Sequence, residues 1–261
     1  MFCPRYVSAW CMSKRKRCFD LVLGVAALIL FSPIMVLVGW LIKMTSKGPA
    51  LFRQERVGLH QRSFVILKFR TMDHVCAHVD RGLTVTRQGD PRMTRVGTHL
   101  RRLKLDELPQ LINVVRGHMS FVGPRPKIPQ HENLCMLCRP GITGAATIMF
   151  SHEESLLAEI PEEFVERYVT SVLNPQKCRL DSRYIETARF GTDLRILART
   201  IFKLSNRIFR LSNRIFKLSN RPKSTQAPQP ALFLHKKSSM ERPASIGVSR
   251  VESVEFSMQE D

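Results

Sequence analysis

The sequence lacks the short motifs that identify most enzymes acting on phosphates or cofactors. Its 261 residues contain no Walker loop, no dinucleotide-binding glycine fingerprint, no nucleophile elbow and no pair of histidines spaced to hold a metal. A recognisable nucleic-acid-binding motif is also missing. These absences argue against P-loop, dinucleotide-dependent and serine-hydrolase chemistry, so an active site must be built from other residues.

Acidic residues are scarce, with 22 Asp and Glu against 41 Lys and Arg, and the formal net charge is +19. A charge of this size implies a phosphate-rich partner, which is nucleic acid, anionic lipid or a nucleotide-linked substrate. The long apolar run described below favours membrane lipid as the partner, and no nucleic-acid partner is expected. A non-catalytic basic protein that binds a membrane surface or nucleic acid is the alternative hypothesis.

The seven cysteines are odd in number and scattered along the chain. Only Cys135 and Cys138 have the C-x-x-C spacing of a metal or redox site. One such motif without a second pair is a weak zinc signal. We therefore expect free thiols in a reducing cytoplasm.

Only one long apolar run occurs, at residues 21–42, and about 20 apolar residues suffice to cross a bilayer. The run is too long for a signal-peptide core, and no small-residue cleavage site closes it. Ser32-Pro33 lies in its middle, where Pro33 removes one helical hydrogen bond and clashes with the preceding turn. Basic residues, which favour the cytoplasmic side of a membrane, flank both ends.

These features predict a re-entrant helix–break–helix over residues 14–47 that enters one leaflet and returns to the cytoplasmic face. Ser32 is expected to bond a carbonyl that the break at Pro33 leaves free. A spanning helix with a proline kink is the alternative. Residues 1–13 form an N-terminal extension without a clear pattern.

Residues 48–203 are predicted to form a small cytoplasmic catalytic domain of the α/β class (α+β), rich in helices with short strands. Apolar patterning predicts two strands with Gly58 in the turn between them, and helix start and stop signals predict several helices. The strands are expected at residues 51–57 and 64–69, and the helices at 93–103, 106–116, 153–172 (interrupted near Pro161) and 181–201.

Residues 201–221 are three near-identical units of the heptad Ile-Phe-Lys/Arg-Leu-Ser-Asn-Arg. On a helix, the apolar residues of each unit share one face and the basic residues share the opposite face. This pattern is typical of an amphipathic helix on an anionic membrane surface. A coiled-coil seam, which also has a period of seven, and a duplication without a role are the alternatives. Residues 222–261 are expected to be disordered.

Two adjacent carboxylates, Asp106 and Glu107, lie at the start of a predicted helix. Such acids often cap the helix and complement its dipole, which is the structural interpretation. In the functional interpretation, a carboxylate held at this position binds Mg²⁺ or attacks phosphorus.

Three cations accompany the two acids. Lys68 and Arg70 end an apolar strand, where they could simply be solvated. Arg125 is held between Pro124 and Pro126, and a preset arginine fork suits a phosphate. In the structural interpretation, Arg125 instead donates hydrogen bonds to carbonyls of its own loop. Together with the acids, these residues predict a Mg²⁺–diphosphate site.

A series of motifs follows in order along residues 14–203. They are Lys16-Arg17-Cys18-Phe19-Asp20, Ser32-Pro33, Ser46-Lys47-Gly48-Pro49, Gln54-Glu55-Arg56-Val57-Gly58, Lys68-Phe69-Arg70-Thr71-Met72, Leu105-Asp106-Glu107-Leu108-Pro109-Gln110, Asn113-Val114, Ser120-Phe121-Val122-Gly123-Pro124-Arg125-Pro126 and Arg139-Pro140-Gly141-Ile142-Thr143-Gly144. The series resembles the bacterial sugar transferase family, the monotopic polyprenol-phosphate phosphoglycosyl transferases.

The resemblance implies that the chain transfers a phosphosugar from a UDP-sugar to undecaprenyl phosphate. The products are undecaprenyl-diphosphate-sugar and UMP, and the reaction begins exopolysaccharide, O-antigen or glycoprotein glycan synthesis. It also implies a protein of the inner (cytoplasmic) membrane with its catalytic domain facing the cytoplasm. A homodimer is left open.

By the same resemblance, Asp106 is the nucleophile that forms a covalent phosphosugar intermediate, and Mg²⁺ neutralises the leaving UMP. Glu107 assists in metal binding or proton handling, and Lys68, Arg70 and Arg125 hold phosphate oxygens. The segment 152–174 is longer than in the common form of the family, and the chain also departs from it just after Gly144. The donor sugar therefore stays open.

Overall fold

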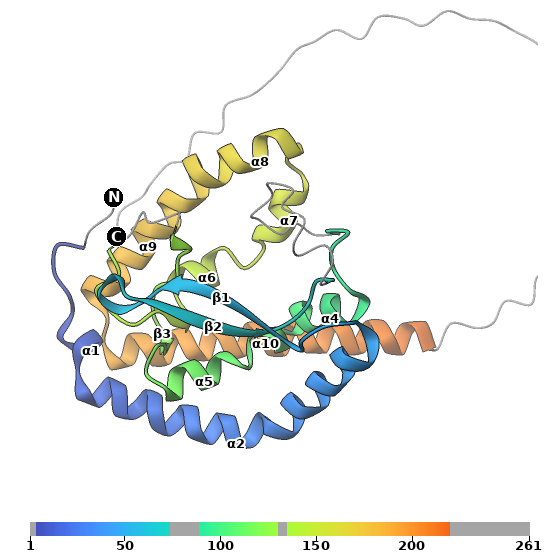
Figure 1. The fold of residues 1–261 in the computed structure, drawn as a ribbon. Coiled ribbons are helices and arrows are strands. Elements are labelled where there is room, and N and C mark those ends of the chain that lie inside the picture. The colour runs from blue at the N-terminus through green and yellow to red at the C-terminus, as the bar shows by residue number, and fades with distance from the viewer. Residues whose placement is uncertain (1–3, 74–88, 130–134, 220–261) are drawn as a thin grey trace, which may run out of the picture. The chain divides into compact units, whose positions relative to one another are not determined.

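The computed structural model describes residues 4–73, 89–129 and 135–219 (Figure 1). The tail expected at 222–261 and the last two residues of the heptad repeat lie outside these described residues.

Helix α2 (Lys14–Thr45) follows the short helix α1 (Ala9–Met12) and is capped by Ser13, whose hydroxyl accepts a hydrogen bond from the Lys16 amide. The expected break at Pro33 is not present, because α2 is helical throughout this range. Pro33 has no amide hydrogen to donate to the Ile29 carbonyl, four residues back. The Ser32 hydroxyl donates to that carbonyl instead, at 2.8 Å, as expected from the sequence. Figure 1 shows α2 bending along its length.

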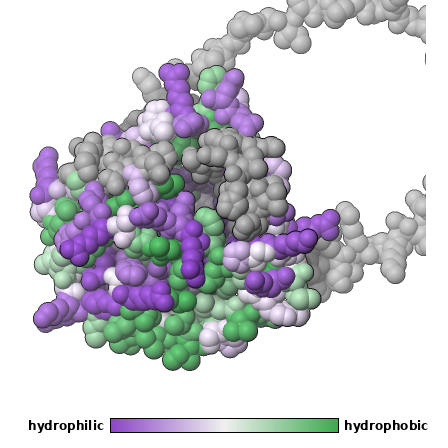
Figure 2. Space-filling model, in the orientation of Figure 1, coloured by the Kyte–Doolittle hydropathy of each residue, from purple (hydrophilic) through white to green (hydrophobic). Residues whose placement is uncertain are grey.

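Both ends of α2 pack against the same domain. Near its start, a Cβ at Gly24 would lie 3.3 Å from side-chain atoms of Val114 and Val115, so the absent side chain allows close packing on helix α5. Near its end, Val38 and Ile42 are buried with Phe69 and Leu100. The opposite side of α2 exposes apolar residues, which form the green lower edge in Figure 2; they include Val22, Ile29, Leu30, Val36, Leu37 and Trp40.

The strands form two separate two-stranded sheets within the described residues. Strands β1 (Leu51–Val57) and β2 (Ser63–Phe69) are an antiparallel hairpin, with Leu51 opposite Phe69. Both were expected from the sequence, and β2 begins one residue earlier than predicted. Strands β3 (Ser120–Val122) and β4 (Gly141–Thr143) pair in parallel and were not predicted.

The helices follow the predicted order, but α6 (Ala145–Met149) was not predicted, α9 (Asn174–Thr187) begins before residue 181, and two predicted helices are divided. The segment 106–116 is a 3₁₀ turn and a separate helix, and the segment 181–201 belongs to two helices, because Ala188 is extended with ψ 135°. The interruption near Pro161 is confirmed. The elements are α4 (Arg95–Leu103), η2 (Leu105–Glu107), α5 (Gln110–Val115), α6 (Ala145–Met149), α7 (Glu153–Ala158), α8 (Glu162–Tyr168), the π-helix η4 (Val169–Leu173), α9 (Asn174–Thr187) and α10 (Phe190–Ser219).

The cysteines differ in one respect from the expected free thiols. Cys11, Cys18, Cys138 and Cys178 are free. Cys135, however, is disulfide-bonded, so the prediction is wrong for this residue. The prediction of free thiols was based on the expected reducing compartment, whereas disulfide formation also depends on the distance between two thiols in the fold.

Asn113 joins α5 to the outer edge of β2. Its side-chain oxygen accepts a hydrogen bond from the Leu67 amide at 3.0 Å, and its side-chain nitrogen donates to the Val65 carbonyl at 2.7 Å. The residue is only 1% exposed, so neither strand group can turn to water instead. Asn113 therefore sets the position of β2 relative to the segment that carries the two carboxylates.

We expect Asn113→Ala to lower the free energy of unfolding by about 1–3 kcal/mol, because it leaves two buried backbone groups of β2 unpaired. Thermal unfolding of the protein in lipid nanodiscs measures the change. Asn206→Ala, at an exposed position of α10, is the matched control. Equal melting temperatures for the two variants would contradict this role of Asn113.

Candidate active site

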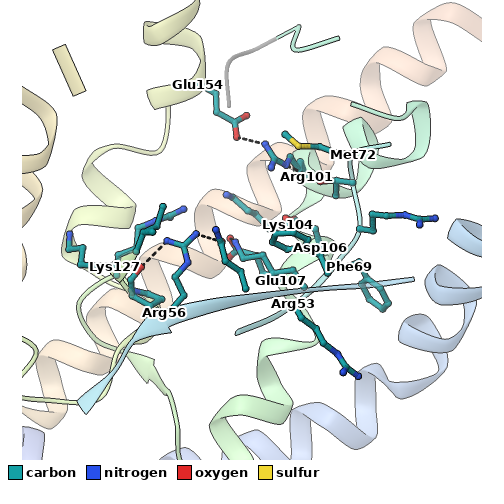
Figure 3. Close-up of a pocket in the computed structure, with 18 of the residues that line it drawn as sticks. Arg53, Arg56, Phe69, Met72, Arg101, Lys104, Asp106, Glu107, Lys127 and Glu154 are labelled. Atoms are coloured by element: carbon teal, nitrogen blue, oxygen red, sulfur yellow. Dashed lines mark hydrogen bonds and ion pairs between the residues drawn. The ribbon is translucent and has the colours of Figure 1, made fainter. Parts of the chain in front are cut away.

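A cleft of about 1110 Å³ lies between the β1–β2 hairpin, η2 and the segment from α7 to α9. Most of the charged side chains that line it are cationic. Figure 3 shows Lys104, Asp106 and Glu107 near its centre, with Arg56 and Lys127 on one side and Arg101 on the other. Asp106, Glu107, Lys68 and Arg125, predicted from the sequence as site residues, all border this one cleft.

The two carboxylates are placed by a sharp change of direction after α4. Lys104 takes the left-handed conformation, with φ 59°, and thereby ends α4 and starts η2. Asp106 is 6% exposed, and its Oδ1 is buried without a hydrogen-bond partner. Asp106 caps neither η2 nor α5, so the capping interpretation is wrong. A buried carboxylate oxygen without a partner costs free energy and is a common mark of a functional site.

The environment moves the pKa values of the two neighbouring carboxyls apart. Burial, and then the negative charge of Glu107, raises the pKa of Asp106 to about 6. Burial also acts to raise the pKa of Glu107, but the positive charges of Lys68, Lys104 and Arg125 outweigh it and lower this pKa to about 2. Glu107 is thus ionised at all physiological pH values, whereas Asp106 changes protonation near pH 6. Adjacent acids that differ in this way can take different chemical roles.

Lys68 makes the closest charge contact of the dyad. Its Nζ lies 3.3 Å from Oε1 of Glu107, and the two side chains are 22% and 15% exposed. Burial lowers the pKa of Lys68, while the Glu107 charge raises it. Lys68 comes from β2, some 40 residues before the dyad in the sequence, so the hairpin delivers this cation to η2.

Arg125 lies exposed in a tightly held loop after β3. The flanking residues Pro124 and Pro126 are buried, and the Arg125 backbone amide donates to Oδ2 of Asp181 at 3.4 Å. The same carboxylate oxygen lies 3.4 Å from Nζ of Lys127. Asp181 therefore fixes the loop, and the Arg125 side chain extends from a rigid base.

Arg56 is a cleft residue that sequence reasoning did not select. Its guanidinium donates to the Pro126 carbonyl at 3.4 Å and to the side-chain oxygen of Gln54 at 2.5 Å. Burial, and then the charge of Arg125, lowers the pKa of Arg56 to about 10. Its position in the motif Gln54-Glu55-Arg56 is the sequence signal that could have identified Arg56 as a site residue.

Arg70 borders the cleft but has its hydrogen bonds elsewhere. Its guanidinium donates to the Lys47 carbonyl at 2.6 Å and to the Ser46 carbonyl and hydroxyl at 2.9 and 2.7 Å. Arg70 is only 7% exposed. Arg70 thus holds the end of α2 against β2, and its predicted contact with a phosphate stays a prediction.

The far wall of the cleft comes from α7, η4 and α9. Lys177 of α9 is buried, pairs with Glu153 at 2.6 Å and lies 5.7 Å from the centre of the Phe150 ring. Val169 and Thr170 of the π-helix also line the cleft. Single-turn π-helices are frequent at functional sites. The unusual length of segment 152–174 was the only feature of the sequence that could have indicated its part in the cleft.

Mg²⁺ suits the donor set at the dyad. The ion prefers oxygen ligands and usually binds one or two carboxylates together with substrate phosphates. The unpartnered Oδ1 of Asp106 and the ionised carboxylate of Glu107 match this preference. No group of three or more His, Cys, Asp or Glu side chains that could hold a metal occurs in the parts of the chain that the structure describes.

Asp106→Asn should stabilise the protein at neutral pH. The folded-state pKa of about 6 lies above the ordinary 3.8, so the free energy of unfolding falls as pH rises between these values. Removing the ionisation should raise it above pH 6 by at most about 3 kcal/mol, at about 1.36 kcal/mol per pKa unit. Below about pH 4 the gain should vanish.

Thermal unfolding in nanodiscs with a metal chelator, at acidic and neutral pH, measures this effect. Glu159→Gln, which removes an exposed carboxylate outside the cleft, is the control. A stability gain that is the same at both pH values would show that the ionisation of Asp106 is not its cause.

The sequence model of a family described as "Bacterial sugar transferase" matches residues 11–207. Three relatives are similar over about three quarters of this chain. A UDP-glucose:undecaprenyl-phosphate glucose-1-phosphate transferase of Caulobacter vibrioides is 38% identical over 197 residues, which are 72% of this chain and 68% of the relative. The enzyme of the same name from Escherichia coli is 37% identical over 72% of this chain and 39% of the relative.

An undecaprenyl-phosphate glucose phosphotransferase of Komagataeibacter xylinus is 39% identical over 210 residues, or 76% of this chain. The match spans only 37% of that relative's length. The chain therefore spans less than two fifths of two of these relatives and about two thirds of the third.

Proposed function

This chain belongs to the bacterial sugar transferase family, and from that membership we propose that it transfers a phosphosugar from a UDP-sugar to undecaprenyl phosphate and releases UMP. The observation that carries the proposal is the pair Asp106–Glu107, whose pKa values are moved apart within a cationic cleft. The relatives' names include both a glucose and an N-acetylgalactosamine phosphotransferase, so the donor sugar stays open.

In the first step, a carboxylate oxygen of Asp106 attacks the phosphorus that bears the sugar. A bond forms between that oxygen and phosphorus, the bond to the bridging oxygen breaks, and UMP leaves with the bridging oxygen. The buried Oδ1 of Asp106 supports this role, because no hydrogen bond occupies its lone pairs. In the second step, a phosphate oxygen of undecaprenyl phosphate attacks the same phosphorus and displaces Asp106.

Cations of the cleft stabilise the phosphate charges during both steps. Arg125 extends from a rigid loop, so little ordering is required when it binds a phosphate. Lys68 faces the dyad and keeps Glu107 ionised. Asp106 and Glu107 would hold Mg²⁺, which supplies charge neutralisation at the leaving UMP when bound.

Helix α2 supports insertion of the protein into one leaflet of the inner membrane, with the domain in the cytoplasm. Only 11% of its most apolar stretch is buried, unlike the core helix of a soluble protein. Near its start, Arg17 donates to the carbonyls of Val114 and Val115 at 2.7 and 2.8 Å. Its end is held by Arg70. Because both ends contact one domain, α2 enters and leaves on the same side, and a span is disfavoured.

The cleft extends to this anchor, since Lys43 in the last turn of α2 lines it. A lipid-borne phosphate at the membrane surface can therefore reach Asp106 while its chain stays among lipids. The alternative, a non-catalytic basic binding protein, gives no reason for a buried carboxylate without a partner. It would be favoured if joint replacement of Lys68, Asp106 and Glu107 left the biological function intact.

Asp106→Ala should abolish transfer without releasing the protein from membranes. Purified membranes are incubated with Mg²⁺, undecaprenyl phosphate and a panel of UDP-sugars, and UMP release is measured. We expect a loss of at least about 10³-fold for Asp106→Ala, because no other group replaces a missing nucleophile. Glu159→Gln should keep full activity.

With a donor labelled at the sugar-bearing phosphate, denatured wild-type protein should retain label and Asp106→Ala should not. Full turnover by Asp106→Ala would refute the covalent route. If no UDP-sugar gives UMP with the wild-type protein, the transferase proposal itself fails.

Epitope tags placed before Met1 and after Asp261 should both lie in the cytoplasm. The physical reason is that α2 leaves the membrane on the side where it enters. Antibody access is measured in spheroplasts before and after the inner membrane is permeabilised. Access to one tag in intact spheroplasts would show that α2 spans the membrane.

A further inference from the structure

Helix α10 continues beyond the region that defines the family. The family match ends at residue 207, whereas α10 runs from Phe190 to Ser219 and carries the heptad repeat. From the contacts of its first five turns we infer that α10 lies in the headgroup region of the same leaflet as α2, with an apolar stripe against the lipid and arginines among anionic headgroups. This inference rests on the proposed membrane insertion of α2.

The stripe consists of large apolar residues along one side of α10. Phe190, Leu194, Ile201 and Ile208 follow one another at intervals of four, seven and seven residues, which places them on one side of a helix. These residues, together with Phe202 and Phe209, are 48–67% exposed. Six exposed apolar side chains of this size along one helix are unusual for a soluble protein and mark an interaction site.

The other side of α10 is held against the domain, so the stripe cannot turn inward. The hydroxyl of Thr200 lies 2.8 Å from that of Thr143 in β4. Farther along, Lys203 donates to the Ile148 carbonyl at 2.8 Å, and Arg207 donates to the Ser151 carbonyl at 2.9 Å. These contacts fix the rotation of α10 about its own axis.

The stripe begins at the membrane anchor. The Phe190 ring stands 5.5 Å from the ring of Phe19 in α2, in an edge-to-face arrangement. One turn later, Asp193 forms a buried ion pair with Lys16, in the first turn of α2. The apolar side of α10 therefore adjoins α2, whose exposed apolar residues are proposed to face lipid. This position favours lipid as the partner of the α10 stripe as well.

The charge of α10 supports anionic lipid rather than a second copy of the chain. Arg195, Arg199 and Arg210 are exposed beside the stripe, and the only acid of the helix, Asp193, is already paired with Lys16. Arginines at such a border bury their stems and place their charges among headgroups. A coiled coil of two copies of α10 would bring like charges together without acidic partners.

Fluorescence quenching in vesicles tests this inference on the full chain. Trp10 is retained throughout, because its indole nitrogen donates to Asp193. The Trp40→Phe protein serves as the baseline, and Phe209→Trp or Arg210→Trp is added to it. Each protein is reconstituted into phosphatidylcholine–phosphatidylglycerol vesicles with or without brominated acyl chains. UMP release confirms that each variant is folded.

We expect brominated lipid to quench the added Phe209→Trp fluorescence at least about twofold more than that of Arg210→Trp, which lies about 100° around the helix. The native Trp40, exposed on α2, reports on the anchor in the unmodified protein. If Trp40 is quenched but Phe209→Trp is not, the inference about α10 is wrong while the anchor stands. If Trp40 is not quenched, the membrane insertion itself is wrong. If brominated lipid does not quench the Phe209→Trp fluorescence and chemical cross-linking yields a dimer, the stripe contacts a second copy of the chain instead of lipid.

Discussion

The ion pair between Lys68 and Glu107 is the interaction on which the site depends. Two adjacent buried carboxyls without a cation would both have raised pKa values and would compete for one proton. The charge of Lys68, supported by Lys104 and Arg125, instead keeps Glu107 ionised, with a pKa of about 2. For Asp106, burial and the charge of Glu107 outweigh the opposing charges of Lys68, Lys104 and Arg101, and its pKa rises to about 6. Asp106 is therefore still mostly ionised at neutral pH, at a cost in stability.

The membrane anchor and the site share the strand that carries Lys68. Arg70, two residues farther along, donates to Ser46 and Lys47, the two residues that follow α2. Asn113 holds the other edge of β2 on α5. The start of α2 packs on α5 as well. A change in the position of α2 would therefore move Lys68 relative to the dyad. The proposed chemistry needs this coupling, because the acceptor phosphate is available only at the depth of the membrane surface.

Local patterns in the sequence predicted local structure well. The hairpin strands, the interruption near Pro161 and the hydrogen bond from Ser32 follow from alternation, from proline geometry and from a carbonyl that must be satisfied. The expected break at Pro33 did not form, and the Ser32 hydroxyl satisfies the carbonyl that Pro33 leaves free within the continuous helix α2. The hydrogen-bond partners of Arg70 and Lys177 could not be predicted, because they are 23 or more residues away in the sequence.

The order of many short motifs along the chain identified the family, and residue types alone pointed to Asp106, Glu107 and the apolar segment around Pro33. These conclusions need only residue types and spacing. The fold places Lys104 beside Glu107 in addition to the predicted Lys68 and Arg125, gives Arg70 its hydrogen bonds at the end of α2, and leaves one side of α10 exposed. The physical reason is that burial and charge interactions depend on distance in space. Lys68 could be selected from the sequence among 41 Lys and Arg residues, but its distance of 3.3 Å from Glu107 is a property of the fold alone.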